Sequence, residues 1–198
     1  MSRFQLLFVL ACTAGLITVA CGQGPTQSQA PAEEAPVSQP PTTPEQKIQN
    51  AMSAAPAGIA RDATIMDWPA TPDGPMVELR PGTNNWTCLP ALAHTPANDP
   101  MCMDQAAMQW AEAWAARQPP QMSGIGIGYM LQGGATPDND DPFATEPKEG
   151  SDWVMEPPHL MLFGVSIPPG AYPTEPDTRG PWVMWGGTPY EHLMVPVQ

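Results

Sequence analysis

The stretch "DQAAMQWAEAWAARQPP", residues 104 to 120, constrains the fold more than any other part of the chain. Asp104 is typical of a residue that caps the start of a helix, and two consecutive prolines at 119–120 cannot continue one. Apolar side chains recur at helical spacing on one stripe: Met103, Ala107, Trp110 and Trp114. The pattern predicts a helix over residues 103–118 whose two tryptophans are core anchors rather than a ligand platform.

Segments on both sides of that helix have the pattern of strands. Residues 63–68, "ATIMDW", and 75–80, "PMVELR", flank a Pro-Asp-Gly turn, which predicts a hairpin. In "GIGIGYMLQGG", residues 124–134, glycine alternates with apolar residues. One face of that strand is therefore bare backbone, which a neighbouring helix or strand can approach closely.

Proline and capping signals bound the architecture further. Thr43, followed by Pro44 and Gln46, matches a capping box and predicts a short helix that ends before Pro56. Of the 28 prolines, six lie at or before residue 44, and the 22 that remain in the predicted domain argue against long helices and broad regular sheets. The predicted fold class is α+β: a small twisted antiparallel β-sheet of about five to seven short strands, with one or two flanking helices and Pro-rich ordered loops.

The first residues have the pattern of an export signal. One basic residue, Arg3, precedes an apolar run from Leu6 to Ala20, which is too short for a transmembrane helix. The sequence "ITVAC" followed by Gly22 resembles the lipobox of bacterial lipoprotein precursors, and this resemblance covers residues 1–22. It implies that cleavage leaves Cys21 as the lipidated first residue, and that Gly22 is compatible with sorting to the outer membrane.

Two alternatives to this cleavage site stay open. "VLAC", ending at Cys12, matches the same pattern, but it leaves an apolar segment that is shorter than signals usually have. A plain secretory signal cut near Ala20 would leave Cys21 as a free thiol. Thr18 also stands where the lipobox usually has leucine.

The predicted organisation has three parts: a signal peptide over residues 1–20, a lipidated Cys21 with a disordered Pro-rich tether to residue 44, and one globular domain over residues 45–198. The tether is rich in Pro, Gln, Ser, Ala and Thr, a composition that cannot bury enough apolar surface to fold. The predicted location is the bacterial cell envelope, as an outer-membrane lipoprotein that faces the periplasm or the cell surface.

Two cysteines remain once Cys12 leaves with the signal and Cys21 carries lipid. Two thiols in an oxidising compartment are expected to pair, so Cys88 and Cys102 predict a disulfide. The alternative is a metal site formed by these two thiols and His94, although the spacing is not that of a zinc motif.

A repeated pattern occupies the last third of the chain. His-Leu-Met occurs at residues 159–161 and again at 192–194, and Trp-Val-Met precedes it both times. The order suggests two similar strand-turn-strand units, turned at residues 157–158 and at 186–189.

These repeats contain the candidate ligands for a soft metal. Alternate residues of a strand share a face, so His159 points with Met161, and His192 points with Met194. Imidazole and thioether ligands suit Cu(I), which makes these four residues a candidate copper site. The alternative is that both histidines make ordinary hydrogen bonds while methionine fills an irregular core.

A second candidate metal site lies in the loop "TPDNDDPFATEP", residues 136–147. Asp138, Asp140 and Asp141 place hard oxygen ligands close together, as calcium requires, but the EF-hand order is absent. A solvated acidic loop is the alternative.

Charge and motifs limit the function classes. Acidic residues outnumber basic ones by 20 to 7, so nucleic acid is not an expected partner. No GxSxG, HExxH or P-loop motif occurs. The favoured function is an envelope-anchored, non-catalytic binding or structural module, with the membrane as partner through its lipid and an envelope protein as a candidate partner.

The alternatives are a periplasmic metal-binding protein, with copper or calcium, and an envelope hydrolase. A hydrolase would use a histidine oriented by a carboxylate such as Asp67, Asp104, Glu156 or Glu191, among which no spacing selects.

Overall fold

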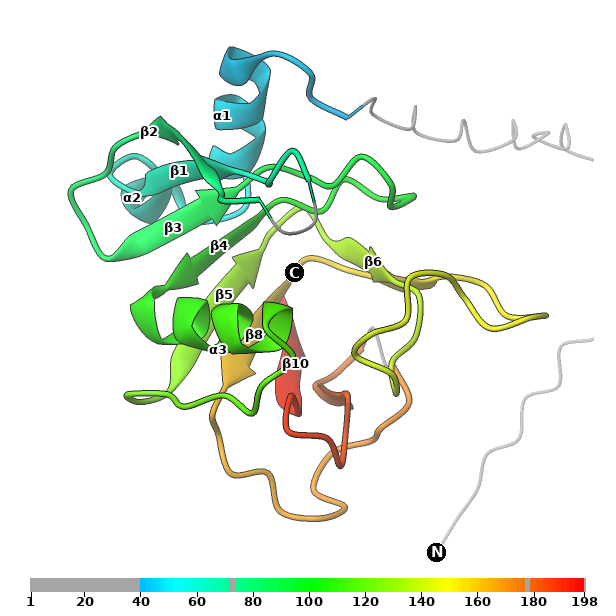
Figure 1. Ribbon diagram of the computed structural model, residues 1–198. Coiled ribbons are helices and arrows are strands. Elements are labelled where there is room, and N and C mark those ends of the chain that lie inside the picture. The colour runs from blue at the N-terminus through cyan, green and yellow to red at the C-terminus, as the bar shows by residue number, and fades with distance from the viewer. Residues whose placement is uncertain (1–39, 72–73, 177–178, 198) are drawn as a thin grey trace, which may run out of the picture. The chain divides into compact units, whose positions relative to one another are not determined.

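The computed structural model describes residues 40–71, 74–176 and 179–197 (Figure 1). Eight of the strands in these residues form one sheet, in the order β2-β1-β3-β4-β5-β8-β10-β9. Their bounds are β1 Thr64–Asp67, β2 Val77–Arg80, β3 Trp86–Leu89, β4 Met101–Asp104, β5 Gly126–Met130, β8 His159–Phe163, β9 Trp182–Met184 and β10 His192–Pro196. A separate antiparallel pair consists of β6 (Gly134–Thr136) and β7 (Val154–Glu156).

The main sheet is larger than the predicted one, and it is mixed rather than antiparallel. β1 and β2 form the predicted antiparallel hairpin, but β3 runs parallel to β1, with Thr64 opposite Thr87. The chain reverses once at the hairpin and again through the short connection 81–85. It therefore enters β3 on the free side of β1 in the original direction. The prediction of an antiparallel sheet was wrong at this pair. The direction in which two strands pair depends on the path of the chain between them, which the hydrophobic pattern of each strand does not contain.

Within the described residues, three helices accompany the sheet: α1 (Pro44–Met52), α2 (Ala57–Ala60) and α3 (Gln105–Ala115). The predicted capping box at α1 is confirmed. The Thr43 hydroxyl accepts a hydrogen bond from the Gln46 N–H, and the Gln46 side chain accepts one from the Thr43 N–H. None of the helices within the described ranges is long and apolar enough to cross a membrane.

α3 begins later than the sequence predicted. Met103 belongs to β4, and Asp104, in extended conformation, ends that strand and caps the helix. The Asp104 carboxylate accepts from the Ala107 N–H at 2.8 Å and from the Ile127 N–H of β5 at 3.1 Å. One side chain therefore starts α3 and joins it to the neighbouring strand.

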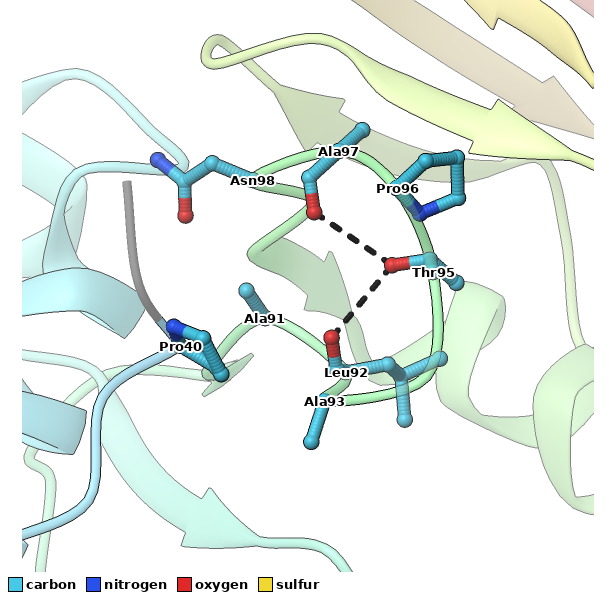
Figure 2. Close-up of a pocket in the computed structure, with 8 residues that line it drawn as sticks. All are labelled: Pro40, Ala91, Leu92, Ala93, Thr95, Pro96, Ala97 and Asn98. Atoms are coloured by element: carbon cyan, nitrogen blue, oxygen red, sulfur yellow. Dashed lines mark hydrogen bonds between the residues drawn. The ribbon is translucent and has the colours of Figure 1, made fainter. Parts of the chain in front are cut away.

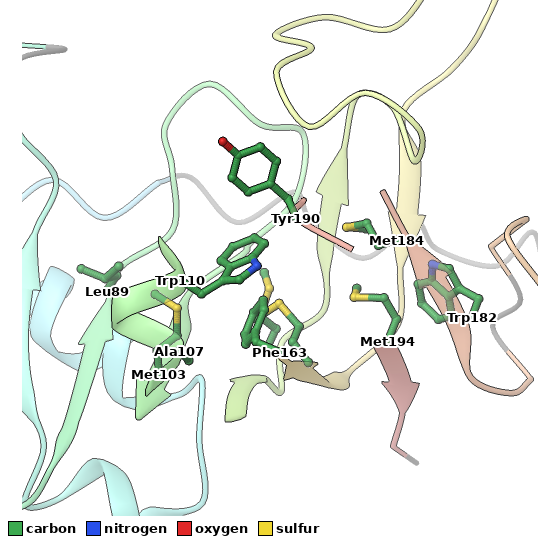
Figure 3. Close-up of a cluster of buried hydrophobic side chains, with 11 residues drawn as sticks. Leu89, Met103, Ala107, Trp110, Phe163, Trp182, Met184, Tyr190 and Met194 are labelled. Carbon is green, nitrogen blue, oxygen red and sulfur yellow. The ribbon is translucent and has the colours of Figure 1, made fainter. Parts of the chain in front are cut away.

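Each face of the main sheet has its own apolar cluster. Directly opposed residues in neighbouring strands share a face. One row crosses seven strands on the face that α3 covers: Thr64, Thr87, Met103, Gly128, Met161, Met194 and Trp182. Figure 3 shows Trp110 and Ala107 of α3 lying over Phe163 and Met103 in this cluster.

The opposite face is covered by α1 and α2 at the β1–β4 end (Figure 1). Its cluster consists mostly of small side chains, together with one isoleucine: Ala51, Ala54, Ala55, Ala60, Ala63, Cys88, Cys102 and Ile65. Small residues allow the short helices to lie close to the sheet.

A neighbouring helix approaches β5 closely, as the sequence predicted. A Cβ atom on Gly126 would lie 2.5 Å from the Ala107 nitrogen and 2.8 Å from its Cα. The backbone of α3 therefore sits almost directly on the backbone of β5, which only glycine at this position permits.

The predicted pair of strand-turn-strand units is half right. β9 and β10 pair antiparallel across the turn at 186–189. β7, however, pairs with β6 rather than with β8, which lies between β5 and β10. The Pro157–Pro158 turn moves the chain from one sheet to the other, so the sequence likeness does not extend to pairing.

Candidate functional site

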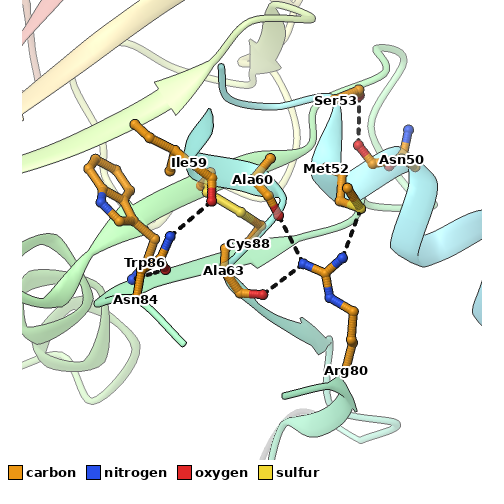
Figure 4. The surroundings of a disulfide bond; sticks show 11 residues. Asn50, Met52, Ser53, Ile59, Ala60, Ala63, Arg80, Asn84, Trp86 and Cys88 are labelled. Atoms are coloured by element: carbon orange, nitrogen blue, oxygen red, sulfur yellow. Dashed lines mark hydrogen bonds between the residues drawn. A yellow bond between two sulfur atoms is a disulfide. The ribbon is translucent and has the colours of Figure 1, made fainter. Parts of the chain in front are cut away.

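The predicted disulfide is present and joins two neighbouring strands inside the main sheet. Cys88 and Cys102 face each other across β3 and β4, and both are fully buried (Figure 4). Nearby, the Arg80 guanidinium donates to the carbonyl oxygens of Ala60 and Ala63, which ties β2 to the segment that leads into β1. Because both thiols are bonded to each other, the alternative metal site with the exposed His94 does not form.

The register brings the four candidate copper ligands onto one face of β8 and β10. Met161 and Met194 are directly opposed, whereas His192 lies opposite Phe163 and His159 lies opposite Pro196. Four residues along an antiparallel strand correspond to about 13 Å, so the two histidines stand at opposite ends of the row. One ion cannot contact both of them in this arrangement. Copper binding stays a prediction.

His192 is enclosed by aromatic rings. The rings of Phe163, Trp110 and Trp185 have centroids 4.9, 5.1 and 5.3 Å from that of His192. Its Nδ1 is 2.9 Å from the Tyr190 carbonyl oxygen and donates a hydrogen bond to it. Burial lowers the pKa of His192 to about 4, so the ring is neutral at neutral pH.

His159 lies at the other end of the row with a carboxyl group beside it. Its Nδ1 donates to the Pro157 carbonyl oxygen at 2.7 Å, and its Nε2 is 3.8 Å from Glu156 Oε2. Burial lowers the pKa of His159 to about 4, while burial and the charge of Asp99 raise the pKa of Glu156 to about 8. At neutral pH both partners are therefore neutral, and the contact is not an ion pair.

The sequence named Glu156 only as one of several carboxylates that could orient a histidine, and it did not single out Asp99. Asp99 lies next to β4, far from Glu156 along the chain, so only the folded sheet brings them together. Asp99 is itself fixed, because it accepts hydrogen bonds from the Leu92 N–H and the Thr95 hydroxyl.

The candidate calcium loop is held by its own hydrogen bonds. Asp138 Oδ1 accepts from the backbone N–H groups of Asp140 and Asp141, and Asp138 Oδ2 forms a 2.8 Å ion pair with Lys148. The Lys148 ammonium lowers the pKa of Asp138 below its usual value. Asp138 is buried, while Asp140 and Asp141 are exposed, so the three carboxylates do not converge. No cluster of three or more potential metal ligands of the His, Cys, Asp and Glu type occurs in residues 40–71, 74–176 and 179–197. Calcium binding stays a prediction.

Asn139, between those aspartates, was not singled out by the sequence. Its amide donates to the carbonyl oxygens of Thr174 and Val183, and its side-chain oxygen accepts from Trp182 Nε1. These bonds occupy the outer edge of β9 and attach the acidic loop to the sheet. The loop therefore has a structural role in the folded chain.

The described part of the chain includes two hollows that open to solvent. One is a cavity of about 60 Å³ where Pro40 meets the 91–98 loop. The Thr95 hydroxyl, which donates to Asp99, also lies 3.3 Å from the carbonyl oxygens of Leu92 and Ala97 across that loop (Figure 2). The cavity has room for one or two waters only.

The second hollow, named here the α3 groove, is a shallow open depression of about 280 Å³. It lies between α3 and the β1–β3 part of the sheet, and it is lined by Thr64, Asn84, Asn85, Trp86, Thr87, Gln105, Met108 and Glu112. Sequence reasoning missed this groove because its residues come from three separate segments and none has a motif.

Cys21 and Cys12 lie outside the described residues. Comparison with protein-family models, with curated proteins and with solved structures finds no match to this chain.

Proposed function

We propose that this protein is an exported lipoprotein, tethered to the cell envelope through Cys21, whose folded domain is a non-catalytic binding module. The observation that supports export is the disulfide between Cys88 and Cys102 in the middle of the sheet. Such bonds persist in oxidising compartments and are rare in the cytosol. The signal-like residues 1–22 agree with this location.

The positions of the candidate catalytic groups favour binding over catalysis. His159 and His192 are buried, neutral and fixed by carbonyl oxygens, and Glu156 is buried beside His159. A general base must reach a substrate directly or through one water molecule. By contrast, the α3 groove presents exposed polar side chains to solvent.

The tether is tested by labelling cells that express the full chain with a radioactive or clickable fatty acid. The wild-type protein is expected to incorporate label and to fractionate with membranes. Cys21→Ser should remove the label, because the proposed lipid is attached through the Cys21 thiol.

Cys12→Ser is the matched control, since it changes the other cysteine of the signal region and should leave labelling intact. If labelling were lost in Cys12→Ser but kept in Cys21→Ser, the cleavage site would lie before Cys12 and not before Cys21. An unlabelled wild-type chain that remains in the cytosol would refute the proposal.

A further inference from the structure

Several polar side chains of the α3 groove have no protein partner within the described part of the chain. Among the described residues, no hydrogen bond or ion pair joins the side chains of Thr64, Thr87, Asn85, Gln105 or Glu112 to another residue. Thr64 and Thr87 are half-buried and directly opposed in the parallel pair of β1 and β3, so their hydroxyls lie side by side on the floor. Half-buried polar groups without partners are available to a ligand.

The helix supplies the wall of the groove. Gln105, Met108 and Glu112 are three and four residues apart, so they share one stripe of α3. Gln105 and Glu112 are exposed. Asn84 is already used, because its amide donates to the Ile59 carbonyl oxygen and its side-chain oxygen accepts from the Trp86 N–H. The groove thus offers hydroxyl, amide and carboxylate groups, both donors and acceptors.

The groove lacks the features by which peptides are usually recognised. β1 and β3 are interior strands paired on both sides, so the floor has no free strand edge for an added strand. Met108 and Trp86 are the two large apolar residues of the lining, and the Trp86 ring packs against Tyr129 in the cluster on the other face of the sheet. This leaves too little apolar surface in the groove for a helix to dock.

The charge of the groove limits the chemical class of the ligand further. Glu112 is the one charged side chain among the lining residues, and the whole chain has a net charge of −13. Phosphate, sulfate and uronic acid groups would be repelled. The groups present match a ligand with many hydroxyls and no charge, because each ligand hydroxyl can both donate to a carboxylate or amide oxygen and accept from an amide or a threonine hydroxyl.

We propose that the α3 groove binds the ring of a neutral sugar within an envelope glycan, an inference that deepens the proposed function and rests on it. Thr64 and Thr87 would contact the ring from below, while Asn85, Gln105 and Glu112 would bind its hydroxyls. The exposed opening leaves room for a chain of sugars to continue beyond the bound ring.

The test uses the full chain, purified in a detergent without a sugar headgroup, and calorimetric titration with three trimers. A trimer of N-acetylglucosamine and one of glucose are the neutral probes, and a trimer of galacturonic acid is the anionic one. Saturable binding of a neutral trimer is expected. The double variant Gln105→Ala with Glu112→Gln should weaken it at least about tenfold, the equivalent of one or two hydrogen bonds to polar groups.

The matched control is Gln121→Ala with Glu146→Gln, which makes the same chemical changes at two exposed positions outside the groove and should leave binding unchanged. The proposal is overturned by no saturation with either neutral trimer up to about 10 mM, by equal affinity in the groove and control variants, or by tighter binding of the anionic trimer. Fatty-acid labelling does not depend on the groove, so failure here leaves the tether intact.

Discussion

At the scale of single residues, burial of His192 makes the folded protein less stable in acid. His192 is neutral in the folded chain because burial lowers its pKa to about 4, whereas an exposed histidine titrates near 6.5. The unfolded chain therefore binds the proton more readily. The stabilising contribution is complete above about pH 6.5 and is lost as the pH falls toward 4.

Replacing His192 by phenylalanine should reduce this acid sensitivity. Phenylalanine fits among Trp110, Phe163 and Trp185 but cannot be protonated, so the variant should lose about 2 kcal/mol less unfolding free energy than the wild type between pH 7 and pH 5. The measurement is urea unfolding at both pH values. Parallel pH profiles for wild type and His192→Phe would show that this ring is not the group responsible.

At the scale of elements, α3 and β5 lie close together because Gly126 has no side chain at their contact. Asp104 links the two elements by hydrogen bonds, and Gly126 allows their backbones to meet. This packing positions α3 beside the β1–β3 surface, and hence the wall of the α3 groove.

Gly126→Ala should therefore be strongly destabilising. The new methyl group would lie 2.5 Å from the Ala107 nitrogen, a backbone atom that cannot move aside without shifting the helix. Overpacking of this kind costs about 1–3 kcal/mol, and the upper end is expected here. Thermal or urea unfolding measures the loss.

Gly124→Ala provides the control in the same segment. Among the described residues, none beyond its two chain neighbours has an atom within 4 Å of the position that the new methyl group would take. The substitution should change the unfolding free energy by less than about 1 kcal/mol. Equal effects of the two substitutions would mean that backbone flexibility, not the helix contact, accounts for the glycines.

At the scale of the whole molecule, two apolar clusters lie on opposite faces of one sheet and share its central strands. The disulfide joins β3 to β4 within the cluster that contains α1 and α2. The other cluster consists largely of aromatic and methionine side chains under α3. Both clusters include residues of β3 and β4. The disulfide between these two strands therefore contributes to the stability of both faces of the sheet.

Removing the disulfide should lower the stability of the whole domain. With 14 residues of separation, the double variant Cys88→Ala with Cys102→Ala is expected to lose about 3 kcal/mol of unfolding free energy. Urea unfolding, followed by tryptophan fluorescence, measures this change. Wild type under reducing conditions should match the variant, and a loss below about 0.5 kcal/mol would contradict the structural role.

The sequence alone determined the features that depend on neighbouring residues. The Thr43 capping box, the hairpin of β1 and β2, the cap at Asp104 and the close approach at Gly126 were predicted correctly, because capping, turn chemistry and glycine spacing act over a few residues. The Cys88–Cys102 bond was also predicted, since two thiols had one partner each.

Which distant segments meet is known from the folded structure alone. It placed β3 parallel to β1, joined β7 to β6 instead of β8, separated His159 from His192 along one row, and brought Asp99 to Glu156. It also assembled the α3 groove from three segments that share no motif. Strand partners and register depend on the path of the connections and on which sheet face is buried. The secondary-structure preferences of individual segments do not specify either.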